Sequence, residues 1–403
     1  MTKKRIALLT VWFPPTNGVA VNRMKAFANY LGDNFIVEVF TLGDRDEKKE
    51  TTFGTVHYYS SKSILNKIKH KNSDGRLLHN LKSLVNIIAS RLRLSQLKTW
   101  KKKVNKNFKQ IHTKNPFDII ISSYAPVEPH DIAVELCKEF CELIWIADMR
   151  DEMSSNPFSS ASDKKFLKKK EASYVNYLSG LISVSKPILE DFKEIYPSLN
   201  NFEEIRNGFD HDFVPSYHFN SEFTIVYAGM FYGKRKPGLF FEALLSALKK
   251  NRIKPDFKIK FIGTTRNFSI PVEIEDHIEF IPPVCYLEAI KEMSMADCNL
   301  LINPPLGTLG QFSGKVFDYL SVEKPILALV DTKDVAAELI RDHNGGIATD
   351  FFSVEDIENG LCEIYNYWKR KEVFPVKRNK TNELHRKFQV EKLERFILNI
   401  LQK

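Results

Sequence analysis

The feature that most constrains the fold of this chain is a repeated alternation between short apolar runs and longer amphipathic stretches. This order is typical of a parallel β-sheet covered by helices. Strand-length apolar runs occupy residues 5–11, 36–41, 55–59, 118–122, 143–147 and 180–184, and the pattern restarts at residues 223–228, 257–262, 278–281, 298–302 and 325–329. Because 403 residues exceed the about 250–300 that one core serves, the sequence predicts two tandem, doubly wound, Rossmann-like α/β domains.

The boundary between the two domains is expected in residues 210–222, which contain Pro215 and few helix-forming residues. This gives a first domain at residues 1–212, a second at 213–382 and a final helix at 383–403. The helix is predicted from apolar side chains that recur at three- and four-residue spacing. Such sheets bind ligands beyond the carboxyl ends of their strands, so two of these edges facing each other predict an interdomain cleft.

Composition excludes several classes of protein. Hydrophobic residues make up 43% and charged residues 27% of the chain, which is typical of a globular protein and not of a disordered one. No apolar run reaches the roughly 18 residues that a membrane span needs, and residues 6–11 are interpreted as a buried strand rather than a signal peptide. Five cysteines without a metal-ligand pattern indicate a reduced, cytoplasmic protein.

Two loops of the second half have the composition of an anion-binding site. Residues 303–314 are rich in glycine and proline and precede a helix that begins at Lys315, so backbone N–H groups could approach a diphosphate there. Asp318, one turn into that helix, could accept two hydrogen bonds from ribose hydroxyls. The other loop carries Lys234, Arg235 and Lys236 between glycines, which suits a phosphate clamp. Solvated surface turns are the competing interpretation of both loops.

The first half offers three further candidates. A loop with Gly18 leads into a helix that carries Arg23 in its first turn. The segment Asp148-Met149-Arg150-Asp151 places charges at the mouth of a buried strand, where they could bind sugar hydroxyls or form local ion pairs. His130 lies in another loop between a strand and a helix, although a single histidine is more often structural than catalytic. No Walker, HExxH, GxSxG or Rossmann GxGxxG motif is present.

Taken together, these stretches resemble the GT-B glycosyltransferases, specifically the retaining group called family four. The resemblance covers nearly the whole chain. It rests on the motifs Phe13-Pro14-Pro15 with Gly18 and Arg23, Ile182-Ser183-Val184-Ser185, Arg206-Asn207-Gly208-Phe209-Asp210, Tyr227-Ala228-Gly229, and Ser313-Gly314-Lys315-Val316-Phe317-Asp318-Tyr319-Leu320. The stretch from Ala147 to Asp151 is similar to a segment of bacterial polysaccharide-building members.

The resemblance implies that the second domain binds a UDP- or GDP-linked sugar and that the first domain holds the acceptor. It implies retention of the anomeric configuration, no metal and no further cofactor, and a final helix that crosses back to the first domain. The implied donor-binding residues are Gly18, Gly229, Lys234, Arg235, Lys236, Gln311, Phe312, Ser313, Gly314, Lys315 and Asp318. The implied acceptor-binding residues are Arg23, His130, Asp148, Arg150 and Asp151, and the candidate catalytic residues are Arg235, Lys236 and Asp148.

Two positions depart from the family's pattern. Met230 stands where the family has an arginine after the glycine, and Arg235 is expected to replace that arginine. Gly310 stands where the family has the first of two glutamates, which usually contacts the transferred sugar, so the identity of that sugar stays open. The alternatives are another GT-B enzyme of nucleotide sugars, such as an epimerase or an inverting transferase, or a catalytically inactive GT-B partner subunit.

The net charge of +9 is concentrated in residues 62–114, which hold fifteen Lys and Arg against one acid, Asp74. Within this segment, six apolar residues between Leu77 and Leu92 form one helical stripe, followed by Trp100 and Lys101-Lys102-Lys103. Residues 76–103 are therefore expected to bind an anionic membrane surface, unless the stripe packs on the domain's own sheet. This suits a peripheral enzyme at the cytoplasmic face with a polyprenyl-diphosphate-linked glycan acceptor. Few aromatic residues accompany the cations, so nucleic acid is not an expected partner.

Overall fold

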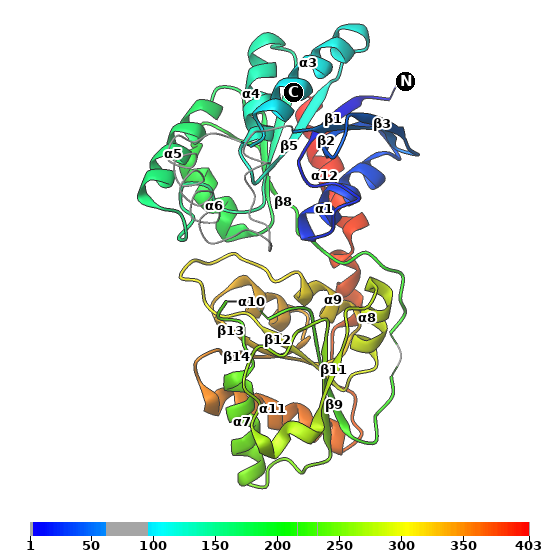
Figure 1. Cartoon of the computed structure of the whole chain (residues 1–403), viewed down its shortest axis with the longest axis vertical. Helices are drawn as coiled ribbons and strands as arrows, with labels where there is room; N and C mark the ends of the chain where they lie inside the picture. The colour runs from blue at the N-terminus through cyan, green and yellow to red at the C-terminus, as the bar shows by residue number, and fades with distance from the viewer. Residues whose placement is uncertain (1–2, 62–95, 216, 232, 403) are drawn as a thin grey trace, which may run out of the picture. The chain divides into compact units, whose positions relative to one another are not determined.

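The computed structural model describes residues 3–61, 96–215, 217–231 and 233–402 (Figure 1). The chain divides into two compact units. The first comprises Met1–Ser183, Leu189–Ile205 and Val390–Lys403, and the second comprises Val184–Ile188 and Arg206–Gln389. Each unit has its own sheet, so the predicted α/β class with two Rossmann-like domains is confirmed.

The sheet of the first unit has the strand order β3-β4-β2-β1-β5-β6-β7-β8 among the described residues. All neighbours in it are parallel except β3 and β4. The strands are β1 (Arg5–Leu9), β2 (Ile36–Gly43), β3 (Glu47–Glu50), β4 (Gly54–Ser60), β5 (Ile119–Tyr124), β6 (Ile144–Met149), β7 (Gly180–Ser183) and β8 (Phe202–Glu204). Its helices are α1 (Val19–Leu31), α3 (Lys98–Lys114), α4 (Glu128–Glu139), α5 (Ala161–Tyr174), α6 (Lys186–Ile195) and α12 (Arg386–Leu401), of which α6 and α12 each begin with residues assigned to the second unit.

The second unit has a parallel sheet in the order β11-β10-β9-β12-β13-β14. Side chains of β9 alternate between two cores, because Ile225 and Tyr227 pack on one face and Val226 on the other. The strands are β9 (Phe223–Ala228), β10 (Phe257–Ile262), β11 (Ile278–Ile281), β12 (Cys298–Ile302), β13 (Ile326–Val330) and β14 (Gly346–Asp350). The helices are α7 (Gly238–Lys249), α8 (Tyr286–Ser294), α9 (Lys315–Ser321), α10 (Val335–Asp342) and α11 (Val354–Lys369), with 3-10 segments η2 (Val272–His277) and η3 (Arg378–Leu384).

All eleven predicted strands are present, with ends shifted by at most two residues. Three short strands were not predicted, namely β3, β8 and β14. The sequence of β3 is Glu-Lys-Lys-Glu, which has no apolar alternation, and β3 forms the antiparallel edge of its sheet. A strand at the edge of a sheet can be largely exposed to solvent, and its sequence then lacks the apolar residues by which a strand is predicted.

Residues 210–222, expected to separate the domains, are held against the second unit. The Asn220 side chain donates to Asp297 (Nδ2 to Oδ2, 2.9 Å), the Tyr217 hydroxyl to Glu323 (3.1 Å), and the indole N–H of Trp368 to the Asn220 carbonyl (3.2 Å). The linking segment is therefore part of the second unit's structure.

The last helix, α12, starts at Arg386 rather than at the predicted residue 383, because η3 occupies residues 378–384. From Val390 onward the helix belongs to the first unit. Its apolar stripe joins that unit's core through Val390, Leu393, Phe396, Ile397 and Ile400.

The predicted membrane segment is only partly within the described residues, because residues 62–95 lie outside them. In α3 the Trp100 side chain is fully buried, so this residue of the predicted membrane-binding segment 76–103 is not available to a membrane surface. Lys101 is paired with Glu135 (2.7 Å) and Lys103 with Asp46 (2.7 Å). No helix in the described part of the chain is long and apolar enough to cross a membrane.

We predict that Leu393→Ala lowers the free energy of unfolding of the first unit by about 2–4 kcal/mol, because it leaves a cavity in a closed core. Leu398 is the matched control: it lies in the same helix but is 40% exposed, so Leu398→Ala should change stability by less than about 1 kcal/mol. Urea unfolding of the full chain measures both. Equal effects of the two substitutions would mean that α12 does not contribute to the core.

Candidate functional site

The loops that follow β9 and β12 meet at one edge of the second sheet, because these strands are parallel neighbours. At the contact point stands Gly229, whose φ of +109° disfavours any other residue. A Cβ at this position would lie 2.7 Å from Cε of Lys315, the first residue of α9. Glycine therefore permits the close approach of the two loops that the sequence assigned to one site.

Lys315 is held by the strand that precedes the first of these loops. Its Nζ donates to the hydroxyl of Tyr227 (3.0 Å) and lies 4.5 Å from the centre of the same ring. Burial, together with the charge of Arg235, lowers the pKa of Lys315 to about 8. The lysine thus stays protonated at neutral pH, but its charge has lost hydration that an anionic ligand would replace.

Of the three consecutive cations in the loop after β9, Arg235 is the one that is fixed. Its guanidinium donates to Oδ1 of the buried Asn303 (2.6 Å), which begins the loop after β12. Lys234 and Lys236 are exposed, and no described acid pairs with either. Arg235 therefore shares a site with Lys315, whereas Lys234 and Lys236 would have to order on binding a ligand.

Asp318 lies on α9 beside Tyr286 of α8, whose hydroxyl donates to Oδ1 (2.7 Å). Burial raises the pKa of Asp318 to about 6, although the Tyr286 hydrogen bond and the charge of Arg386 oppose the shift. An incoming pair of hydroxyl donors would stabilise the carboxylate form. The position suits the ribose ligand that the sequence predicted.

The loop before α9 is anchored by a residue that the sequence analysis did not single out. Gly310 donates its N–H to Oδ1 of Asp334 (2.6 Å), which also accepts from the N–H of Val335 (2.8 Å) and caps α10. An aspartate before an amphipathic helix is a capping signal, but its second role is a tertiary contact. Among the other predicted donor residues, Ser313 is buried, and Gln311, Phe312 and Gly314 are half-buried.

In the first unit, Arg23 and Asp148 form a fully buried ion pair (Nη2 to Oδ1, 2.8 Å). Arg23 also donates from Nη1 to the carbonyl of Ile205 (2.7 Å), and Asp148 accepts from the Ser123 hydroxyl (2.9 Å). Each charge is neutralised inside the protein, and the pair ties α1 to β6 and to the end of β8.

This burial corrects the sequence-based roles of three residues. Arg23, Asp148 and His130 are 2%, 0% and 0% exposed, so none of them can touch an acceptor directly, and Asp148 has no access to reacting atoms. His130 bonds to the Ser122 hydroxyl (2.6 Å), and burial lowers its pKa to about 3, which keeps it neutral. These side chains support the edge of the sheet rather than bind ligand.

Two predicted acceptor residues remain accessible. Arg150 and Asp151 follow β6 and are half-buried. Arg150 donates to the Ser123 hydroxyl (3.0 Å), which in turn donates to Asp148, so the buried ion pair positions Arg150. Burial raises the pKa of Asp151, while the neighbouring Arg150 opposes the shift. Gly18, assigned to the donor, lies in the first unit as the N-cap of α1.

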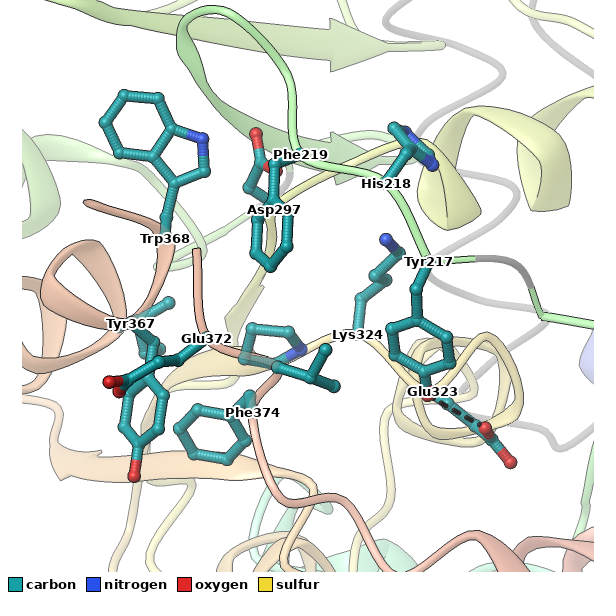
Figure 2. A pocket seen from close by; sticks show the side chains of 13 residues that line it. Tyr217, His218, Phe219, Asp297, Glu323, Lys324, Tyr367, Trp368, Glu372 and Phe374 are labelled. Atoms are coloured by element: carbon teal, nitrogen blue, oxygen red, sulfur yellow. Dashed lines mark hydrogen bonds between the residues drawn. The ribbon is translucent and has the colours of Figure 1, made fainter. Parts of the chain in front are cut away.

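A separate pocket lies at the opposite, amino ends of β12 and β13 (Figure 2). The buried Lys324 and Asp297 line it together with rings from the linking segment and α11. Asp297 is already satisfied by the backbone N–H of Thr224 (2.9 Å) and by Asn220. We interpret this pocket as part of the surface against which the linking segment packs. Within the described ranges, no three His, Cys, Asp or Glu residues gather as metal ligands would.

No protein-family model and no curated protein sequence matches the chain. Solved structures do. Sucrose-phosphate synthase from Thermosynechococcus elongatus has a TM-score of 0.64 at 14% identity over 98% of this chain and 100% of its own. Anabaena Alr3699/HepE, solved in complex with UDP and glucose, has 0.63 at 12% identity over 98% and 100%. The structure described as trehalose-6-phosphate from E. coli bound with UDP-2-fluoro glucose has a TM-score of 0.63 at 12% identity over 99% of both chains. This likeness confirms the predicted GT-B fold class.

We predict that Asp148→Ala lowers the free energy of unfolding by about 3–5 kcal/mol, since it removes the carboxylate that neutralises the buried charge of Arg23. Lys4→Ala, which removes the exposed partner of Asp118, should cost less than about 1 kcal/mol. Thermal and urea unfolding measure both. An Asp148→Ala variant of unchanged stability that had lost activity would restore a direct role for Asp148.

Proposed function

We propose that the chain is a glycosyltransferase that moves a sugar, of hexose type, from a UDP- or GDP-linked donor to an acceptor hydroxyl with retention of configuration. The observation that carries the proposal is that Lys315 and Arg235 are close enough at the carboxyl ends of β9 and β12 for the charge of one to lower the pKa of the other, while Asp318 follows Lys315 by one turn of α9. This set suits the diphosphate and the ribose of a nucleotide sugar. Two similar structures hold UDP or a UDP-linked sugar, which supports the same donor class.

The chemical task is to stabilise the leaving group. When the bond between the anomeric carbon and the diphosphate breaks, its electron pair goes to the diphosphate oxygen and the sugar becomes oxocarbenium-like. Lys315 and Arg235 are fixed before the reaction by Tyr227 and Asn303, so they stabilise the growing negative charge at little reorganisation cost. Lys236, which is exposed, would add a third cation once the donor is bound.

Retention follows if the acceptor hydroxyl attacks the face that the diphosphate leaves. The acceptor oxygen forms a bond to the anomeric carbon, and its proton passes to the departing phosphate oxygen, so no enzymic nucleophile is required. Among the described residues of the donor loops, no carboxylate replaces the glutamate that the family has at position 310. The configuration of the product is read from its anomeric signal by NMR.

For the acceptor side, we propose that Arg150 and Asp151 bind sugar hydroxyls of a lipid-linked glycan in bacterial surface polysaccharide biosynthesis, with the enzyme at the cytoplasmic face of the membrane. The similarity of residues 147–151 to polysaccharide-building glycosyltransferases supports this assignment, as does the concentration of charge in residues 62–114. Gly310 favours one other function, that of a catalytically inactive partner subunit. Transfer by the purified protein separates the two.

We predict that Lys315→Ala and Asp318→Ala each weaken UDP-glucose binding by about 1.5–3 kcal/mol, the scale of a hydrogen bond to a charged group. Lys254→Ala is the matched control, because Lys254 is an exposed lysine of the same unit outside the two loops. Calorimetry at pH 7.5 measures the affinities, and GDP-mannose is tested in parallel. Unchanged affinity in both site variants, with the fold intact, contradicts the donor site.

A pH dependence follows from Asp318, whose pKa of about 6 lies above the ordinary aspartate value of 3.8. Ribose hydroxyls stabilise the ionised form, so binding lowers this pKa, and the affinity for UDP-glucose should rise as the pH increases through about 6. The measurement uses UDP-glucose and not UDP as the ligand, because the terminal phosphate of UDP itself titrates at about pH 6 and would obscure the titration of Asp318. In Asp318→Asn the rise should disappear. A rise that persists in Asp318→Asn would assign the titration to another group.

A further inference from the structure

A groove of about 860 Å³ is lined by residues of α5 and α6 of the first unit. The two helices are labelled in Figure 1. Its volume is in the range of pockets that hold small ligands, and it is open along one side. One wall consists of Lys164, Lys165, Lys168 and Lys169 of α5. The groove therefore presents a dense positive charge to a ligand of several ångströms in length.

The four lysines form two columns, because residues four apart lie above one another on a helix. None of them forms an ion pair with a described side chain. The next lysine of the same helix, Lys170, is paired with Asp131 (2.6 Å), as Lys101 of α3 is with Glu135 (2.7 Å). The four lysines of the groove therefore have no described acid within ion-pair distance, although the charge of Lys168 also acts on Glu171 of the same helix. Their side chains are exposed or half-buried, so they can bind an anion from outside.

The opposite wall has a different chemistry. Asp191 and Glu194 of α6 line it, and neither pairs with a lysine of α5 among the described contacts. Burial and the charge of Glu194 raise the pKa of Asp191. Carboxylates accept hydrogen bonds from hydroxyl groups, and they repel anionic groups from their side. A ligand that satisfies both walls carries negative charge on one side and hydroxyls on the other.

The shape of the site separates two classes of anionic ligand. A membrane surface is flat and contacts side chains that protrude from a protein, whereas an extended oligosaccharide can bind along a groove. The serines Ser154 and Ser155 also line the groove, and they follow Arg150 and Asp151 closely in sequence. The groove therefore begins in the same loop that carries the accessible candidates for acceptor binding.

We propose that the groove between α5 and α6 binds an anionic oligosaccharide, one with carboxylate or phosphate groups along its length. We further assign this ligand as the acceptor chain, and this second step rests on the proposed transfer activity. The lysines bind the anionic groups, and the acids of α6 accept hydrogen bonds from sugar hydroxyls.

The test measures binding of tetragalacturonate to the full chain by calorimetry, at 50 and 200 mM salt, with the neutral maltotetraose for comparison. We expect tetragalacturonate to bind, more weakly at the higher salt, and maltotetraose not to bind. Replacing Lys165, Lys168 and Lys169 together by Gln should weaken binding by about tenfold, or about 1.4 kcal/mol. Replacing Lys254, Lys291 and Lys333 by Gln removes the same charge from the second unit and should change affinity less than about twofold.

Absence of binding to the wild-type chain overturns the proposal, as does equal loss in the two triple variants. Vesicles containing phosphatidylglycerol form a third arm: vesicle binding that needs the α5 lysines, without oligosaccharide binding, would assign the groove to a membrane and overturn it too. UDP-glucose affinity is measured on the same samples. If the chain binds tetragalacturonate but not UDP-glucose, the proposed transfer activity is contradicted, whereas the proposed anionic site in the groove is supported.

Discussion

A parallel sheet brings the carboxyl ends of all its strands to one edge, and the candidate donor site depends on this constraint. β9 and β12 are more than 70 residues apart in sequence but adjacent in the sheet, so the loops that follow them share one edge. Gly229 allows the two loops to touch, and the contact fixes Lys315 against Tyr227. The other parts of the site follow, since Arg235 reaches across to Asn303 and Asp318 lies one turn farther along α9.

The two units use charge in different ways. In the first unit the buried Arg23 and Asp148 neutralise each other and connect a helix to two strands. In the second unit the desolvated Lys315 has a neutral hydroxyl and a ring as partners, and Arg235 nearby repels it. A buried charge with an internal partner supports the fold, whereas the half-buried Lys315, which has no counter-charge among the described residues, favours an external anion.

Much of the fold could be predicted from the sequence, because buried parallel strands appear as continuous apolar runs. The loops of the candidate donor site were also recognisable, since glycines and cations follow two of those runs. Asp148 and His130 were predicted to contact the acceptor, but both side chains are fully buried. A charged residue at the end of a strand is expected to be accessible, yet Asp148 is neutralised by Arg23 from a helix 125 residues earlier in the sequence. Asp334 was missed because its bond to Gly310 is a tertiary contact that no local pattern encodes.

The most direct test of the central claim is hydrogen exchange of the full chain with and without UDP-glucose, read by mass spectrometry. Backbone N–H groups that bind a diphosphate exchange more slowly in the complex. The account predicts protection in residues 229–238 and 303–318, around Gly229, Lys315 and Asp318, and none around the pocket of Lys324. Protection confined to that pocket, or binding of UDP-glucose without protection of either loop, would contradict it.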